Sequence, residues 1–294
     1  MHRAQSQARV EACREPSPDG VVGSDILAVV TTTAPWSAAA EVAVALAART
    51  GGELTGCRID PEWRELDAAE SMSIPVLGSG AWDDDAQRRD DRAFAEFARE
   101  RGVDDAAWCT AQAGIAQTLR QLGAWHDLAV LERDMVTPER VPDVLGEAML
   151  GCGVPCLLLP DGRRLPSWPF ARVVIGWNGS MEAIRALHAA RGLLMAADAV
   201  HVLDGAVVED EVGRGLPRFD PCRYLARHGI TASRSRVSTD VGSAGEVLLD
   251  ASVRLHADLL VMGAYGRSHL RERVVGGASR YVLEHAEIPL LMRH

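Results

Sequence analysis

The chain has 294 residues, of which 47% are hydrophobic and 24% are charged. This length and composition are typical of a globular protein with enough apolar residues for two domain cores. A formal net charge of −10 at pH 7 excludes a general nucleic-acid binder, because neutralising phosphates requires a basic surface.

No apolar run approaches the length that spans a bilayer. Residues 1–22 are polar and contain prolines, and they lack the apolar core of a secretory signal, so we expect a disordered tail. The six cysteines have neither the spacing of a zinc site nor the pattern of a disulfide framework. These features favour a cytoplasmic protein.

Residues 23–160 are expected to form a first domain in which strands and helices alternate. An apolar run at 26–30 predicts a buried strand, and an alanine-rich helix follows over 37–50, with Ser37 as its N-cap. Residues 60–80 contain prolines and glycines, which predicts a long excursion after the second strand. The remaining elements are strands at 54–59, 106–111, 127–131 and 154–159, and helices at 83–101, 115–122 and 144–150.

Residues 161–169 are expected to be a linker, because prolines and a glycine interrupt both helix and strand there. Residues 170–294 then repeat the order of the first domain. The predicted strands lie at 172–177, 199–203, 230–237, 258–262 and 288–292, and the predicted helices at 181–196, 220–228, 244–256 and 277–285.

The two halves form an internal repeat of about 130 to 140 residues, which is too long for a solenoid unit. Alternation of strand and helix implies an α/β fold with two repeated, doubly wound, parallel five-stranded sheet domains of the Rossmann-like type. Such sheets bind ligands at the carboxyl ends of their strands, where the strand order reverses.

A glycine-containing loop follows the fourth strand of the second half. Gly263 and Gly266 open the loop, and Gly276 and Gly277 stand at the start of the next helix. Glycines allow close approach of a ligand, and a helix N-terminus suits a phosphate. The same glycines could also serve only to shape a tight connection, so this segment alone leaves both interpretations open.

The second half resembles the universal stress protein family, and the whole chain resembles the tandem, two-domain form of that family. The resemblance lies in three segments: Val173–Ser180, His201–Asp204, and the spacing of Gly263, Gly266 and Gly276. It implies an adenine nucleotide alpha hydrolase-like fold that binds ATP, alone or with Mg²⁺. Together with Arg267 from the basic connector, the expected nucleotide-binding residues are Asn178, Val202, Gly263, Gly266, Arg267, Gly276, Gly277 and Ser279.

Two positions depart from the family pattern. Gly277 stands where nucleotide-binding members have Ser or Thr, so the N–H group remains but a hydroxyl contact is lost. Ser279 could replace that contact or could cap the helix. Asn178 stands where many members have Asp, and its amide can both donate and accept.

The first half lacks the glycine loop. Glu132, Arg133 and Asp134 stand where the glycines would begin, and a carboxylate there opposes a triphosphate. We therefore expect the first domain to bind no nucleotide.

His126 with Asp127, and His256 with Asp258, recur before the fourth strand of each half. Because no third ligand accompanies either pair, a structural role is favoured over a metal site. No nucleophile elbow, Walker loop or zinc-protease motif is present. The sequence thus assigns no catalytic residue and no metal ligand, and predicts at most slow ATP hydrolysis.

The leading interpretation is an adenine-nucleotide-binding protein with a sensing or stress-tolerance role, acting as a homodimer or as an intramolecular pseudo-dimer. A nucleotide-free protein of the same fold, which dimerises and docks partners, is the alternative. A third interpretation is a small-molecule hydrolase or transferase that uses residues 60–80 as a lid.

Overall fold

The computed structural model describes residues 24–66, 84–162, 170–205, 219–237, 244–265 and 277–294. The predicted tail at 1–22 and most of the predicted linker lie outside these ranges, as do Gly266, Arg267 and Gly276. Of the excursion predicted at 60–80, the structure describes residues 60–66, and these include a short 3-10 helix, Pro61–Trp63, that follows the second strand.

The described residues form one ten-stranded sheet in the order β3-β2-β1-β4-β5-β10-β9-β6-β7-β8. All the pairings are parallel except the one between β5 and β10. The predicted α/β fold with five strands in each half is confirmed. The strands are β1 (Ile26–Val30), β2 (Leu54–Ile59), β3 (Ala106–Ala111), β4 (Leu128–Glu132), β5 (Cys156–Leu159), β6 (Arg172–Trp177), β7 (Ala199–Asp204), β8 (Ala232–Arg236), β9 (Leu259–Gly263) and β10 (Leu290–Arg293).

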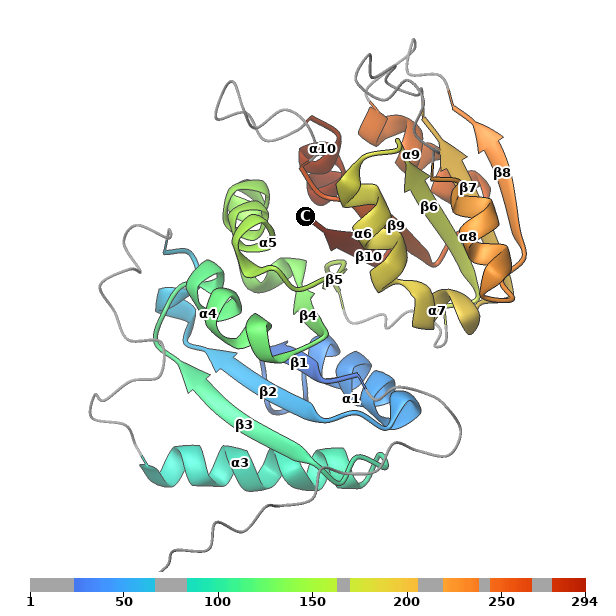
Figure 1. Ribbon diagram of the computed structural model, residues 1–294. Coiled ribbons are helices and arrows are strands. Elements are labelled where there is room, and N and C mark those ends of the chain that lie inside the picture. The colour runs from blue at the N-terminus through green and yellow to red at the C-terminus, as the bar shows by residue number, and fades with distance from the viewer. Residues whose placement is uncertain (1–23, 67–83, 163–169, 206–218, 238–243, 266–276) are drawn as a thin grey trace, which may run out of the picture.

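Helices cover both faces of this sheet (Figure 1). A first hydrophobic core includes residues of α4, α5, α9 and α10, and a second core on the opposite face includes residues of α1, α3, α6 and α8. Each core contains residues of both halves. The helices are α1 (Ala38–Thr50), α3 (Asp84–Arg99), α4 (Ile115–Leu122), α5 (Gly146–Cys152), α6 (Met181–Ala189), α7 (Arg191–Met195), α8 (Pro221–Arg227), α9 (Ala244–Arg254) and α10 (Gly277–His285).

The local sequence explains how the first helix of each half begins. Ser37 and Ser180 have extended backbones and accept hydrogen bonds from Ala40 N and Ala183 N, as N-cap residues do. Every residue of β1 is buried, as expected for a central parallel strand that is covered on both faces.

The two halves join where β5 pairs with β10. The register places Leu290 opposite Leu158, and Met292 opposite Cys156, in an antiparallel pair. Arg133 strengthens the joint, because its guanidinium donates to the carbonyl of Ala286 at 2.7 Å and to the carboxylate of Asp161 at 2.9 Å. The two predicted five-stranded sheets are therefore one continuous sheet.

Several boundaries differ from the predicted ones. The helix predicted at 181–196 is divided into α6 and α7 at Ala190, and the helix predicted at 144–150 is preceded by a π-helix, Val141–Leu145. In the described ranges, no helix has both the length and the apolarity needed to cross a membrane.

Candidate functional site

A pocket of about 300 Å³ lies in the second half at the carboxyl ends of β6, β7 and β9. Its volume is at the lower end of the range of ligand pockets. The pocket brings together four of the residues predicted from the sequence: Asn178, Gly263, Gly277 and Ser279. Apolar side chains form much of the remaining wall: Trp177, Leu203, Val237, Val247, Leu248 and Met262.

The pocket lies where the strand order reverses. The chain runs from β6 to β7 and β8 on one side, and then returns to place β9 on the other side of β6. The helices that follow these two strands, α6 after β6 and α10 after β9, therefore pack on opposite faces of the sheet. Ligands of doubly wound sheets bind in such a crevice.

Asn178 follows β6 directly and shapes the turn into α6. Its Oδ1 accepts a hydrogen bond from Ser180 N at 3.0 Å, and Gly179 between them has a φ of +75°. The amide also carries two donor hydrogens. Asn178 can therefore hold this turn and still donate to a ligand.

Gly263 is required by packing, whether or not a ligand binds. A Cβ at this position would lie 2.5 Å from Ala183 N and 2.8 Å from the Cβ of Glu182. The N-terminal turn of α6 thus lies against the last residue of β9. The tight-connection explanation for this glycine is sufficient, so Gly263 by itself does not indicate a phosphate.

Gly277 has a different environment at the first position of α10. A Cβ there would meet no atom within 4 Å, and the residue is exposed. Because it is not among the glycines with positive φ, a side chain at this position would fit without backbone strain. The hydroxyl that the family pattern has here is missing, although the described residues leave space for it.

Ser279 ties the start of α10 to the end of β9. Its buried Oγ accepts a hydrogen bond from Tyr265 N at 3.0 Å. The hydroxyl therefore closes the connection between β9 and α10, and its own proton can still be donated to a ligand.

Val202 lies in the interior of β7 and is fully buried. Its neighbours in the sheet are Ile175 and Arg234. Leu203 and Gly205, rather than Val202, line the pocket on this side. The structure thus brings the predicted Asn178, Gly263, Gly277 and Ser279 together, while Gly266, Arg267 and Gly276 lie outside the described residues.

A buried carboxylate near the β7 side of the pocket is paired with a cation. Asp204, at the end of β7, accepts hydrogen bonds from Arg234 Nη2 at 2.5 Å and from Nε at 3.2 Å. The bond to Asp204 raises the pKa of Arg234. Because this charge is neutralised, it opposes an anionic ligand less than a free carboxylate would.

Tyr265 also lines the pocket, and the sequence reasoning did not single it out. It follows Ala264 in the loop after β9, has a φ of +57° and is 1% exposed. A large aromatic residue between the two glycines of the Gly-x-x-Gly pair was the available signal, because such a side chain has to be buried somewhere.

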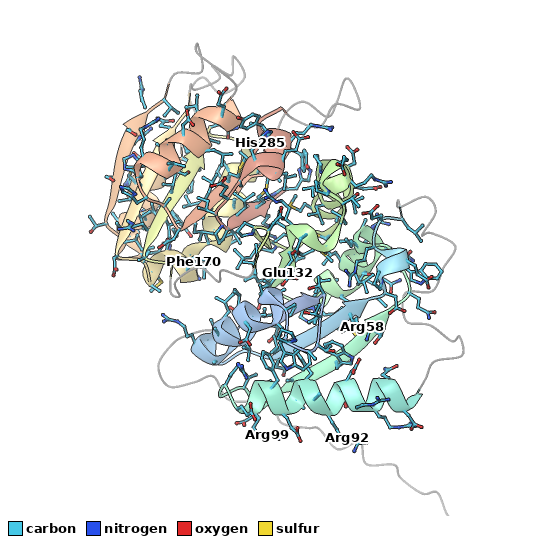
Figure 2. All side chains as sticks on the ribbon, turned by 180° about the vertical axis from the view of Figure 1, so that it is seen from behind. Arg58, Arg92, Arg99, Glu132, Phe170 and His285 are labelled. Carbon is cyan, nitrogen blue, oxygen red and sulfur yellow. The ribbon has the colours of Figure 1, made fainter. Side chains whose placement is uncertain are left out.

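The first half has no glycine loop, and a glutamate fills the equivalent place. Glu132, labelled in Figure 2, ends β4 as Gly263 ends β9. Its side chain is buried, with 5% of the residue exposed. Its Oε1 accepts a hydrogen bond from Ala39 N at 2.7 Å, and its Oε2 accepts one from the hydroxyl of Thr31. The carboxylate thus occupies the N-terminus of α1 from inside the protein.

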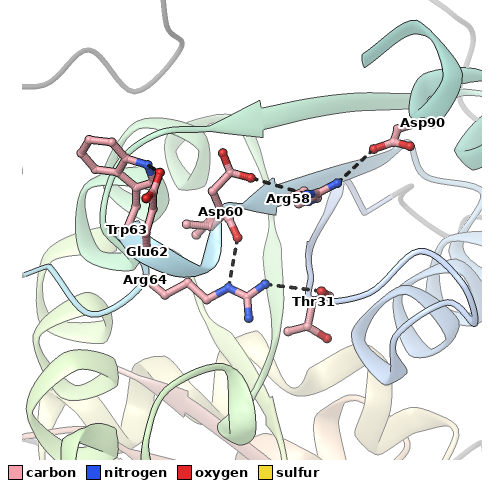
Figure 3. Close-up of polar contacts among 8 residues, drawn as sticks. Thr31, Arg58, Asp60, Glu62, Trp63, Arg64 and Asp90 are labelled. Atoms are coloured by element: carbon pink, nitrogen blue, oxygen red, sulfur yellow. Dashed lines mark hydrogen bonds and ion pairs between the residues drawn. The ribbon is translucent and has the colours of Figure 1, made fainter. Parts of the chain in front are cut away.

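An arginine completes this internal polar network at the ends of β1 and β2. The guanidinium of Arg64 donates to the carbonyls of Ile59 at 3.0 Å and Thr31 at 3.4 Å (Figure 3). Burial and the charge of Arg58 lower the pKa of Arg64, and the nearby carboxylates of Glu132, Asp60 and Asp134 offset part of this effect. The first half therefore places charged side chains at the strand ends where the second half has its glycines. A pocket of about 380 Å³ beside them is lined by the carboxylates of Glu41, Glu132 and Asp134, which oppose an anionic ligand.

The repeated His–Asp pairs have a structural role at the opposite ends of the strands. Asp127 Oδ2 accepts from Asp25 N at 3.1 Å, and the two oxygens of Asp258 accept from Ala171 N and Arg172 N at 2.9 Å. In each half the carboxylate anchors the start of the first strand. In the described part of the chain, no group of three His, Cys, Asp or Glu residues is arranged to hold a metal ion.

Comparisons with known proteins agree with this architecture. Residues 169–294 match the model of the Universal stress protein family. Curated proteins give no match. A universal stress protein from Archaeoglobus fulgidus DSM 4304 is 14% identical with a TM-score of 0.56, and the alignment covers 93% of this chain and 97% of that one.

Two proteins from Pseudomonas aeruginosa are also similar over their whole length. One, from strain UCBPP-PA14 and classed with the universal stress proteins, is 17% identical with a TM-score of 0.60, covering 92% of each chain. The other, a protein of unknown function from strain PAO1, is 18% identical with a TM-score of 0.60, covering 94% of each chain. Residues 169–294 therefore form a domain of the universal stress protein family, and the chain as a whole has the fold of the two-domain universal stress proteins.

Proposed function

We propose that this protein binds an adenine nucleotide in the pocket of its second half, and that occupancy of this pocket serves a sensing or stress-tolerance role. The observation that carries the proposal is the meeting of Asn178, Gly277 and Ser279 in one pocket at the reversal of strand order. Family membership of residues 169–294 supports it.

The chemistry of the wall suits the two parts of a nucleotide. The apolar side chains of Leu203, Leu248 and Met262 offer a surface for a purine ring. The start of α10, at Gly277, offers unpaired backbone N–H groups and the positive end of a helix dipole for a phosphate. We propose ATP, bound as its magnesium complex, as the ligand, and we propose a binding role without rapid turnover.

The direct test uses the protein as purified. Acid denaturation should release ATP or ADP at near-stoichiometric yield, which chromatography detects. Calorimetry of protein stripped of nucleotide should give a dissociation constant for ATP below the millimolar range. The absence of both released nucleotide and measurable affinity would refute the proposal. That result would favour the alternative, a nucleotide-free protein that docks partners.

A matched pair of variants locates the site. Gly277→Asp and Gly277→Asn both fit the open space at the start of α10, but only Asp adds a negative charge beside the phosphates. We expect the Asp variant to bind ATP at least tenfold more weakly than the Asn variant, because unit charges about 4 Å apart interact by about 1 to 4 kcal/mol near a protein surface. Equal affinities for the two variants would place the nucleotide elsewhere.

A further inference from the structure

One side chain of the candidate site extends into the other half of the protein. Tyr265 follows β9 in the second half, and its hydroxyl donates to the carbonyl of Pro142 in the first half, at 3.5 Å. The side chain is almost fully buried, and Tyr265 also lines the second-half pocket. One residue thus belongs to both the pocket and the contact between the two halves.

Gly146 of the first half makes room for this side chain. A Cβ at Gly146, the first residue of α5, would overlap the hydroxyl oxygen of Tyr265 and lie 3.0 Å from its Cζ. Gly146 directly follows the π-helix Val141–Leu145, whose residue Pro142 accepts the hydrogen bond. Single π-helical turns within helices are frequent at functional sites.

The backbone of Tyr265 is held on the pocket side. Its N–H group donates to Ser279 Oγ at 3.0 Å, and the preceding residue, Ala264, donates to Arg293 O at 2.8 Å. The φ of +57° at Tyr265 is unfavourable for a residue that has a Cβ. Burial of the ring in the first half stabilises this conformation against the alternatives.

A second contact joins the same two segments. Arg280, near the start of α10, forms an ion pair with Asp143 of the π-helix, with 3.4 Å between Nη1 and Oδ1. The side chains are 44% and 56% exposed, so the pair contributes little energy. It shows, however, that the start of α10 and the loop after β9 meet the same first-half segment.

We propose that Tyr265 is a positioning residue through which the first half holds the wall of the second-half pocket. Packing of the ring against Gly146 fixes the loop after β9, and through Ser279 it fixes the first turn of α10. The inference about ligand affinity rests on the proposed nucleotide site, whereas the positioning itself does not. The half that lacks a glycine loop thereby takes part in the site of the other half.

The first test needs no ligand. Gly146→Ala should accelerate hydrogen exchange of the backbone amides of residues 264–265 and of residue 281, the first amide that can bond within α10, because the added methyl group displaces the ring of Tyr265. Gly151→Ala is the matched control in the same helix, since its Cβ would meet the flexible end of Arg120 at 3.3 Å. Unchanged exchange at these amides in a folded Gly146→Ala protein would refute the positioning role.

The second test uses rescue and ATP. Gly146→Ala should weaken ATP binding at least fivefold, while Gly151→Ala leaves it unchanged. Adding Tyr265→Phe removes the oxygen that the new methyl group overlaps, so the double variant should recover most of the lost affinity. Failure of the double variant to recover both exchange protection and affinity would refute the role of the hydroxyl contact.

The two tests separate this inference from the proposed function. If wild-type protein binds no ATP, the nucleotide proposal is wrong, and the exchange measurement still decides whether Gly146 positions the loop through Tyr265. If wild-type protein binds ATP and Gly146→Ala binds it equally well, the nucleotide proposal stands and the coupling between the halves is wrong.

Discussion

Equivalent strands of the two halves end in residues of opposite character, Glu132 in β4 and Gly263 in β9. At Gly263 the start of α6 lies so close that a Cβ would meet Ala183 N at 2.5 Å. At Glu132 the carboxylate oxygens instead accept hydrogen bonds from Ala39 N and the Thr31 hydroxyl. The same position is thus used for close packing in one half and for capping a helix in the other.

Replacing Glu132 should therefore destabilise the first half. Glu132→Ala leaves the buried N–H of Ala39 without its acceptor, which costs about 1–3 kcal/mol. Glu132→Gln can keep both hydrogen bonds if its amide donates to Thr31, so it should cost less. Urea denaturation followed by circular dichroism measures both, with the exposed Glu139→Ala as control. Equal stability of Glu132→Ala and wild type would contradict the capping role.

Tyr265 predicts a dependence of stability on alkaline pH. Burial and the negative charge of Asp143 raise its pKa above the ordinary value of tyrosine. The folded protein keeps the proton of the Tyr265 hydroxyl more tightly than the unfolded chain does. The contribution of this hydroxyl to the free energy of unfolding is therefore complete below pH about 10, and it declines as the pH rises towards the higher pKa of the folded state. Denaturation between pH 9 and 11 should show a smaller loss of stability in Tyr265→Phe than in wild type. Parallel losses in the two proteins would argue against a buried, protonated Tyr265.

Among the elements, α10 carries the position at which the candidate site departs from its family. Gly277 begins the helix, and a side chain there would point into open space among the described residues. A hydroxyl at this position can add a hydrogen bond to a phosphate, and bonds to charged groups contribute about 1.5–3 kcal/mol.

Gly277→Ser should accordingly bind ATP more tightly than wild type, by at least threefold in calorimetry. Gly277→Ala is the control, because it adds the Cβ without the hydroxyl and should leave the affinity within twofold. If Ser and Ala behave alike, the phosphates do not approach the start of α10, and the assignment of this helix is wrong.

The sequence predicted the elements well where a single physical signal dominated. Buried parallel strands such as β1 and β9 are short, fully apolar runs, and Ser37 marked the start of α1. The predicted starts of β5 and β10 were less accurate. Each begins one residue after a proline, Pro155 or Pro289, which has no N–H to donate. The split between α6 and α7 and the π-helix depend on tertiary packing, which periodicity does not show.

At the scale of the whole molecule, the site was predicted only on the side that belongs to its own half. Asn178, Gly277 and Ser279 follow strands that a repeat pattern can place, so their meeting in one pocket was predictable. The packing of Tyr265 against Gly146 joins positions 119 residues apart in the chain. No local sequence pattern relates residues so far apart in the chain. The antiparallel pairing of β5 with β10, which brings the halves together, was not predicted.

The difference between the two halves predicts the stoichiometry. The pocket at the strand ends of the first half is lined by the carboxylates of Glu41, Glu132 and Asp134, whereas no carboxylate is among the described residues that line the pocket of the second half. Calorimetry should give one ATP per chain, and Gly277→Asp should weaken that single site at least tenfold relative to Gly277→Asn. Two sites per chain, or one site with equal affinity in Gly277→Asp and Gly277→Asn, would argue that the first half binds nucleotide.

The pairing of β10 with β5 also determines which sheet edges other molecules can reach. In an isolated second half, β10 would be an edge strand, and its free N–H and C=O groups could pair with another chain. In the intact protein that edge is satisfied within the chain, and the outer strands of the described sheet are β3 and β8. Strand β8 presents mostly exposed serine and arginine side chains, which discourage pairing with another sheet. The fusion of the two halves therefore protects the protein against strand-to-strand aggregation, and a fragment containing residues 169–294 alone should self-associate.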